Sequence, residues 1–160
     1  MVPDRLRGVN EHGVTMAELL VVVAIVGIVS AAATPYFMSY MQSAALKAAA
    51  QELAAVISSG RQLAIARNTT VCVALSGNQA LYKTGVSTTC RGGTTYLGAN
   101  THSDGTMSLD NRVTITGTTA NVVFSSLGVA VMAGTYTVHN PTTGNTLSVV
   151  VSSTGRVTIQ

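Results

Sequence analysis

The stretch Gly13-Val-Thr-Met-Ala-Glu18-Leu-Leu-Val-Val-Val-Ala-Ile-Val-Gly-Ile28 decides the architecture of the N-terminal part of the chain. It belongs to an apolar segment, residues 14–34, whose roughly 21 residues would form a helix of about 31 Å, enough to span a bilayer. Glu18 is the only charged residue in this segment. A carboxylate near the edge of such a helix costs about 3 kcal/mol unless it finds a partner. We therefore predict that Glu18 marks a site of pairing and that the chain assembles through this segment.

The composition of the rest of the chain is typical of an exported, β-rich domain. Only 9% of the residues are charged, far below the usual quarter, while Thr, Ser and Gly are abundant in the second half. The net charge of +3 is too small to require an acidic partner, although it leaves nucleic acid open as a ligand. We expect one domain attached to an anchor.

The two cysteines, Cys72 and Cys90, enclose a polar stretch rich in Gly, Ser and Thr. We predict a disulfide between them, which would stabilise the fold by about 3 kcal/mol in an oxidising compartment. A metal site is not expected, because two thiols at this separation with no nearby His lack the spacing of a zinc site.

The leader, residues 1–13, differs from an ordinary signal peptide because the small residue Gly13 precedes the apolar run. This leader, the glycine, and Val14-Thr-Met-Ala-Glu18 before an apolar run resemble the class III signal of type IV pilins and type II secretion pseudopilins. The resemblance implies that prepilin peptidase cleaves between Gly13 and Val14 and that the new amine of Val14 is methylated. It also implies that Glu18 pairs with the terminal amine of a neighbouring subunit. The alternative is an uncleaved single-pass anchor in which Glu18 reaches the membrane interface.

Beyond Pro35 the helical pattern continues as an amphipathic stem. Apolar and small residues recur at spacings of three and four, which predicts one face that packs on a domain; they are Met41, Ala45, Ala49, Leu53, Val56, Ile57, Gly60, Leu63 and Ala64. Pro35 lacks a backbone donor and clashes with the preceding turn, so we expect a kink or local melting there. The helix is expected to end near Arg67 and Asn68.

From Thr69 onward the apolar period changes from 3.6 to 2, which predicts strands. Residues 71–75 and 80–83 form the first expected hairpin, around a turn at residues 76–78. Further strands are expected around residues 113–115, 136–138, 147–151 and 156–160, whereas residues 85–110 are expected to be loop. The fold class is therefore α+β: a long N-terminal helix, made of a membrane half and an amphipathic stem, packed on an antiparallel β-sheet domain as in pilins.

These expectations divide the chain into four parts. The leader is residues 1–13, the transmembrane or filament-core helix residues 14–36, the stem residues 37–67, and the β-rich globular domain residues 68–160. The globular domain is expected in the periplasm or outside the cell.

Later segments narrow the resemblance to the GspH/FimT group of minor pilins and pseudopilins. They are Arg61-Gln-Leu-Ala-Ile-Ala-Arg67, Val71-Cys-Val73, Phe124-Ser-Ser-Leu-Gly128 and Gly155-Arg-Val157. The resemblance implies a subunit of a type IV pilus or a type II secretion pseudopilus that supports filament assembly or protein secretion. It implies a bacterial inner-membrane protein with one span and its C-terminal domain in the periplasm. Its partners would be other subunits, prepilin peptidase, the inner-membrane assembly platform and, before assembly, the lipid bilayer.

DNA capture during natural transformation is the alternative function. Some FimT-like pilins bind double-stranded DNA through a C-terminal Gly-Arg-x-Arg element, which corresponds here to Gly155-Arg156-Val157-Thr158, so the second arginine is replaced. Residues two apart share one face of a strand, so half of the expected pair of guanidinium groups is missing. Lys83, Arg91 and Arg112 are candidates to complete a phosphate-binding patch with Arg156, and the opposing interpretation is that all four are solvated surface residues.

Catalysis is not expected. His12 falls in the leader, His102 and His139 stand alone in the sequence, and neither cysteine lies in a nucleophile or redox motif. The sequence therefore predicts a structural protein without a catalytic residue, cofactor or metal.

Overall fold

A computed structural model of the chain describes residues 13–98, 101–109, 113–117 and 121–160. These residues fall in two units, one ending at Ser39 and one beginning at Tyr40, and each unit is described by itself. The helix α1 (Met16–Ala66) runs through both of them. The domain boundaries predicted from the sequence stay predictions.

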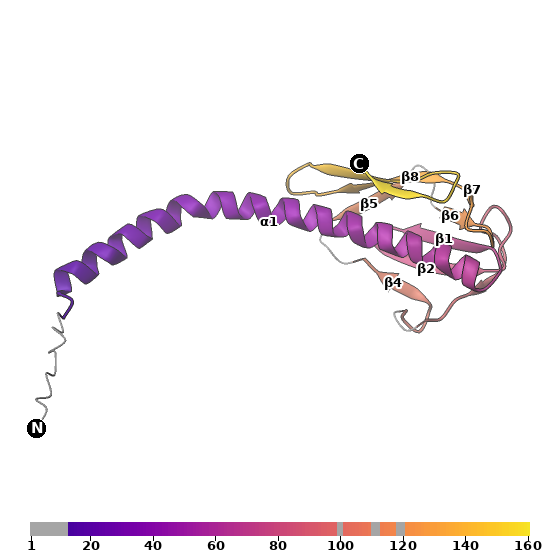
Figure 1. Cartoon of the computed structure of the whole chain (residues 1–160), viewed down its shortest axis with the longest axis horizontal. Coiled ribbons are helices and arrows are strands. Elements are labelled where there is room, and N and C mark those ends of the chain that lie inside the picture. Colours follow the sequence, from indigo (N-terminus) through magenta and orange to yellow (C-terminus); the bar gives the residue numbers. More distant parts are fainter. Residues whose placement is uncertain (1–12, 99–100, 110–112, 118–120) are drawn as a thin grey trace, which may run out of the picture. The chain divides into compact units, whose positions relative to one another are not determined.

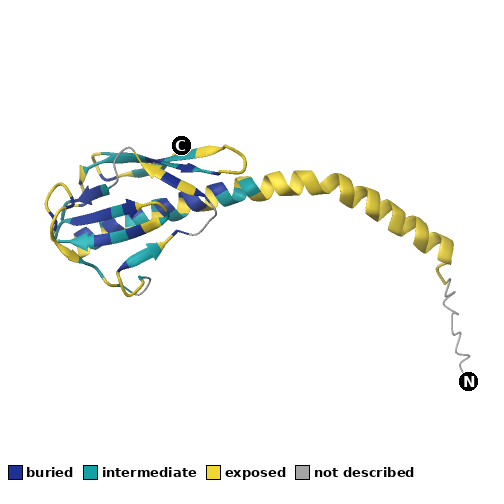
Figure 2. Ribbon diagram, turned by 180° about the vertical axis from the view of Figure 1, so that it is seen from behind, coloured by how far each residue is buried: buried dark blue, intermediate teal, exposed yellow. Residues whose placement is uncertain are grey.

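The first unit consists of the N-terminal half of α1. Its large apolar side chains are exposed in the isolated chain, as the yellow part of the helix in Figure 2 shows. By length and composition, α1 is the one helix among the described residues that could cross a membrane.

The local melting expected at Pro35 is wrong, because α1 is helical on both sides of this residue. Hydroxyl groups near Pro35 bond to helix carbonyls: Thr34 Oγ1 donates to Ser30 O at 2.9 Å, and Ser39 Oγ donates to Tyr36 O at 2.9 Å. Neither bond reaches Ala31 O, the carbonyl that Pro35 leaves without its usual helical donor. A bend of the axis at Pro35 stays a prediction.

Within the second unit, the stem half of α1 packs on the β-sheets through a narrow stripe. Its buried residues are Leu46, Ala49, Ala50, Leu53, Ile57, Gly60 and Ala64. The sequence pattern correctly included five of these residues, but it placed the stripe too early, because Met41 is 52% exposed and the burial begins at Leu46.

The helix ends in a Schellman motif. Asn68 has a φ of 48°, and the amides of Asn68 and Thr69 donate to Ile65 O and Ala64 O at 3.2 and 3.1 Å. Asparagine tolerates this left-handed conformation better than most residues. The end of the helix agrees with the prediction within two residues.

Ten strands follow among the described residues, in two antiparallel sheets. The larger sheet has the order β3-β2-β1-β6-β7, with β4 also paired to β2, and the smaller sheet has the order β10-β9-β8-β5. The strands of the larger sheet are β1 (Val71–Ser76), β2 (Gln79–Thr84), β3 (Thr94–Thr95), β4 (Thr106–Ser108), β6 (Asn121–Phe124) and β7 (Ala130–Met132). Those of the smaller sheet are β5 (Thr114–Gly117), β8 (Gly134–His139), β9 (Thr146–Val151) and β10 (Val157–Ile159).

The antiparallel domain and its first hairpin are confirmed, with Ser76 opposite Gln79 across a two-residue turn. The expectation of loop over residues 85–110 is wrong in part, because both β3 and β4 fall there and pair with β2. Neither strand is long enough to show an alternation of apolar residues in the sequence. Each one forms by pairing with β2 at the edge of the larger sheet.

One hydrophobic core joins the stem to both sheets. It contains residues from α1, from β1, β2 and β6 of the larger sheet, and from β5, β8 and β9 of the smaller one. The largest fully buried side chains are Tyr136, Phe124, Leu53 and Ile57. The core therefore belongs entirely to the second unit.

Candidate functional site

The predicted processing and pairing residues lie at the start of α1. Gly13 and Val14 precede the helix, and Val14 is 72% exposed. Glu18 is exposed in the first turn, and its backbone N–H donates to Thr15 Oγ1 at 3.2 Å. Thr15 is thus the N-cap of α1, a role that the sequence analysis missed, although Thr-x-x-Glu is the spacing of a capping box.

This cap sets the position of Glu18 relative to the start of α1. With Thr15 as N-cap, Glu18 occupies the third helical position, where the partial positive charge of the helix end favours a carboxylate. A chain that begins at Val14 would carry its amine immediately before the cap. A carboxylate and an amine would then lie within the same first turn of each subunit.

The predicted disulfide between Cys72 and Cys90 is confirmed, with a Cα–Cα distance of 5.5 Å. It fastens residues 85–93, which we call the strap, over the face of the larger sheet that points away from α1. Beneath the strap, Cys72, Cys90, Val86 and Val123 form a second small buried cluster. The strand β1 is therefore buried on both faces.

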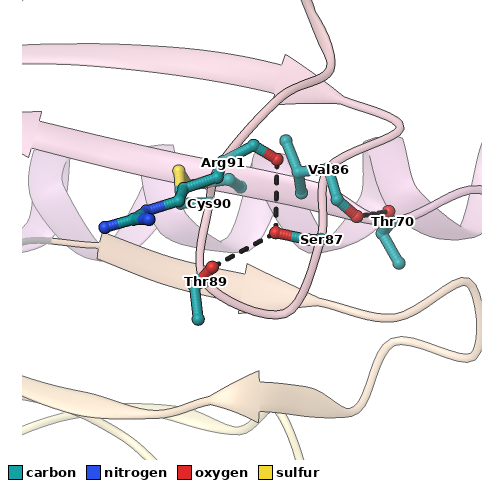
Figure 3. The surroundings of a disulfide bond; sticks show 7 residues. Thr70, Val86, Ser87, Thr89, Cys90 and Arg91 are labelled. Carbon is teal, nitrogen blue, oxygen red and sulfur yellow. Dashed lines mark hydrogen bonds between the residues drawn. A yellow bond between two sulfur atoms is a disulfide. The ribbon is translucent and has the colours of Figure 1, made fainter.

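Backbone and side-chain bonds hold the strap in place (Figure 3). Thr70 Oγ1 donates to Val86 O at 2.7 Å, and Gly85 N donates to Thr70 O at 2.8 Å. Ser87 Oγ donates to Arg91 O at 3.2 Å. The side chain of Arg91 extends away from these bonds and is exposed.

The strand registers bring several loops to one end of the second unit. Val71, the first residue of β1, pairs with Thr84 at the end of β2 and with Phe124 at the end of β6. The strap and the β6–β7 loop, residues 125–129, therefore begin at the end where α1 stops. The β9–β10 loop, residues 152–156, joins them because Ala130 N donates to Ser153 O at 3.1 Å. We call this region the loop end; it lies to the right in Figure 1.

Three of the four candidate phosphate-binding residues lie at or beside the loop end. Arg91 is in the strap, Arg156 is exposed in the β9–β10 loop, and Lys83 is the penultimate residue of β2, opposite Cys72. Arg112 lies outside the described residues. The sequence could not show this proximity, because it arises from pairing between distant strands.

Two arginines at the end of α1 were missed as members of this basic region. The Arg67 guanidinium lies 5.3 Å from the centre of the Tyr96 ring, a cation–π geometry. Arg61 Nε donates to Gly128 O at 2.8 Å. Both residues lie in the quoted segment Arg61–Arg67, but no local signal indicates these distant partners.

The described residues offer little for metal chemistry: no three His, Cys, Asp or Glu side chains among them come together as ligands. Tyr82 is a titratable group whose pKa is changed by its surroundings. Burial raises the pKa of Tyr82 to about 12, and its hydroxyl donates to Val56 O at 2.7 Å. This phenol is held inside the core and acts as a structural group.

Comparisons with known proteins agree with this geometry. Residues 49–155 match the family described as type II transport protein GspH, and residues 9–34 match the prokaryotic N-terminal methylation motif. A search of curated proteins gives no match.

Two crystal structures of the type IV minor pilin FimU from Pseudomonas aeruginosa share the fold. The first has a TM-score of 0.54 at 18% identity and covers 72% of this chain and 92% of FimU. The second has a TM-score of 0.51 at 17% identity and covers 76% and 92%. Because the family match spans more than half of the sequence, the chain belongs to the GspH family of pilin-like proteins, of the GspH/FimT type.

Proposed function

We propose that this protein is a minor subunit that enters a type IV pilus or a type II secretion pseudopilus through its N-terminal helix, with Glu18 paired to the terminal amine of a neighbouring subunit. Proteins of this family are structural subunits rather than enzymes, and they assemble with other pilin subunits after processing by prepilin peptidase. The apolar helix and the methylation motif indicate anchoring in the inner membrane before entry into the filament. The globular unit would then face the periplasm.

The exposed apolar surface of residues 14–39 is the observation that carries this proposal. None of its most apolar window is buried within the chain. Such a surface is stable only in lipid or against other apolar helices. Glu18 is the exception on this surface, and a carboxylate in an apolar environment needs a cation. A neighbouring amine at the same height would satisfy it and would fix the axial register of the subunit.

The test is replacement of Glu18 in the producing bacterium. For Glu18→Ala we expect normal cleavage after Gly13 and normal membrane levels, but much less protein in sheared filaments. Glu18→Asp, which keeps a carboxylate at the same position, is the control and should enter filaments better than Glu18→Ala. Equal incorporation of the Glu18 variant and the wild type, with processing intact, would refute the pairing.

The family description refers to type II transport, and the structural neighbours are minor pilins of type IV pili. Both machines build filaments from such subunits, so the proposal covers either. Recovery of the chain with purified pili or with the pseudopilus of a secretion system would assign the machine.

A second candidate function is capture of double-stranded DNA at the loop end. It is supported by Arg91, Arg156 and Lys83 occurring at or beside the same end of the unit, because cations gathered in one region attract a polyanion more strongly than dispersed ones. We expect the mature chain in nonionic detergent to bind duplex DNA with an affinity that falls steeply with salt. Arg156→Ala should weaken this binding, and Lys47→Ala, on the stem, should not. Absence of binding at low salt would refute this function and leave the filament subunit.

A further inference from the structure

Arg61 is held between two loops of the loop end. Its Nε–H donates to Gly128 O at 2.8 Å across 67 residues of sequence. A Cβ atom on Gly128 would lie 3.0 Å from Arg61 Nε, and one on Gly155 would lie 3.1 Å from the same atom. A side chain at either position would therefore crowd the head of Arg61.

The two glycines also bring the loops against each other. A Cβ on Gly155 would collide with the carbonyl oxygen of Gly128, and both residues have φ near +80°. This conformation favours glycine at both positions. Gly155 is also required for the close approach of the two loops, whereas a Cβ on Gly128 would meet Ile65 and Arg61 of α1. Arg156 directly follows Gly155, so its Cα lies about 3.8 Å from that of Gly155.

The charges of the two arginines are not neutralised within the described part of the protein. Nε is the only nitrogen of Arg61 with a hydrogen-bond acceptor among the described residues, and neither Arg61 nor Arg156 has an ion pair there. Arg61 is half-buried and Arg156 is exposed. Arg61 Nε lies beside the backbone of Gly155, one residue before Arg156, so an anion bound there would be within reach of two cations that lack a carboxylate partner.

We propose that Arg61 and Arg156 together bind a phosphodiester group, and that Arg61 supplies the second guanidinium that the Thr158 position does not. This inference rests on the second candidate function, DNA binding at the loop end. The Nε bond fixes the plane of the Arg61 guanidinium and leaves its two Nη groups to donate to phosphate oxygens. A side chain already held in one geometry loses less conformational entropy on binding. The exposed Arg156 would close on the phosphate from the β9–β10 loop.

The test compares salt dependence rather than affinity alone. The mature full-length chain in nonionic detergent is titrated with a short DNA duplex at several salt concentrations. Each lost phosphate contact lowers the slope of log K against log salt by about 1. We expect this decrease for Arg61→Gln and for Arg156→Gln, and an unchanged slope for the matched control Lys47→Gln, which removes a cation from the same helix as Arg61.

The slope separates a phosphate contact from a structural role. Partial unfolding of Arg61→Gln would lower the apparent affinity by the same factor at every salt concentration, leaving the slope intact. A wild-type slope in Arg61→Gln, together with a reduced slope in Arg156→Gln, would overturn the role of Arg61 while DNA binding stands. Failure of the wild type to bind DNA would overturn both.

A measurement on the wild-type protein covers the case in which Arg61→Gln does not fold. Phenylglyoxal modifies accessible guanidinium groups, and the modified residues are identified by mass spectrometry. We expect duplex DNA to protect both Arg61 and Arg156 from modification. Equal modification of Arg61 with and without DNA, while Arg156 is protected, would refute its contact with phosphate.

Discussion

Gly60 lies where α1 packs closely against the larger sheet. A Cβ at this position would collide with Val73 Cγ2 and would come within 3.3 Å of the Tyr82 ring. We predict that Gly60→Ala destabilises the protein by about 1–3 kcal/mol through overpacking, despite the better helix propensity of alanine. Chemical denaturation would measure this change in the free energy of unfolding. The control Gln62→Ala, on the exposed face of the same helix, should stay within about 0.5 kcal/mol of the wild type. A fully stable Gly60→Ala protein would show that the helix can move away from β1.

Tyr82 gives the fold a predictable loss of stability at alkaline pH. In the unfolded chain the phenol ionises with a pKa near 10, whereas burial raises the pKa of Tyr82 in the folded protein to about 12. Between these values the unfolded state loses the proton first, so the free energy of unfolding falls as the pH rises from about 10 to about 12. At pH 11 this loss is about 1.4 kcal/mol.

Tyr82→Phe tests this assignment. The variant should be less stable than the wild type at pH 8 by about 1 kcal/mol, because the bond to Val56 O is lost. The difference should shrink or vanish at pH 11, since phenylalanine does not titrate and the other tyrosines are common to both proteins. Denaturation curves at the two pH values are sufficient. A constant difference would mean that Tyr82 ionises as easily in the folded state as in the unfolded one.

The strap, residues 85–93, is tied to β1 by the disulfide between Cys72 and Cys90. It covers Cys72 and Val123, which lie on the face of the larger sheet opposite α1. We predict that the double substitution Cys72→Ala and Cys90→Ala lowers the free energy of unfolding by about 3 kcal/mol, as expected for a loop of this length. Thr89→Ala, an exposed position in the same strap, is the control and should have little effect. A wild-type protein with the same denaturation midpoint with and without reductant would contradict this prediction.

Some of the strands could be predicted from the local sequence pattern, and others could not. The hairpin β1–β2 could be found because its apolar alternation and turn residues are local. The short strands β3 and β4 could not, because each forms by pairing with β2 and has only two or three residues. The division into two sheets was also hidden, since it depends on which distant strands pair.

The same distinction holds for the candidate sites of the whole molecule. Glu18 stands out in the sequence as a charge in an apolar run, and the cysteines could be paired by count and compartment. The meeting of Arg61 with Gly128 and Gly155 could not be predicted, because it joins the helix to loops far along the chain. Sites on one helix can thus be predicted from local pattern, whereas sites built by strand register require the fold.

The two units of the whole molecule differ in how each one is stabilised, because the buried core lies in only one of them. Every buried hydrophobic residue that the structure describes lies between Leu46 and Val151. A fragment of residues 40–160 therefore keeps the whole described core, whereas residues 14–39 contribute only exposed apolar surface. We predict that this fragment is soluble without detergent, melts cooperatively, and has nearly the same melting temperature as the globular unit of the full chain.

A shorter fragment, residues 51–160, tests whether the start of the stem matters. It lacks Leu46, Ala49 and Ala50, three residues of the buried stripe. Their loss would open the core beneath the stem and should cost more than about 3 kcal/mol. Calorimetry of the two fragments would show a large drop in melting temperature for the shorter one only. Equal melting temperatures would mean that the first turns of the stem add no stability, and the buried stripe would then effectively begin at Leu53.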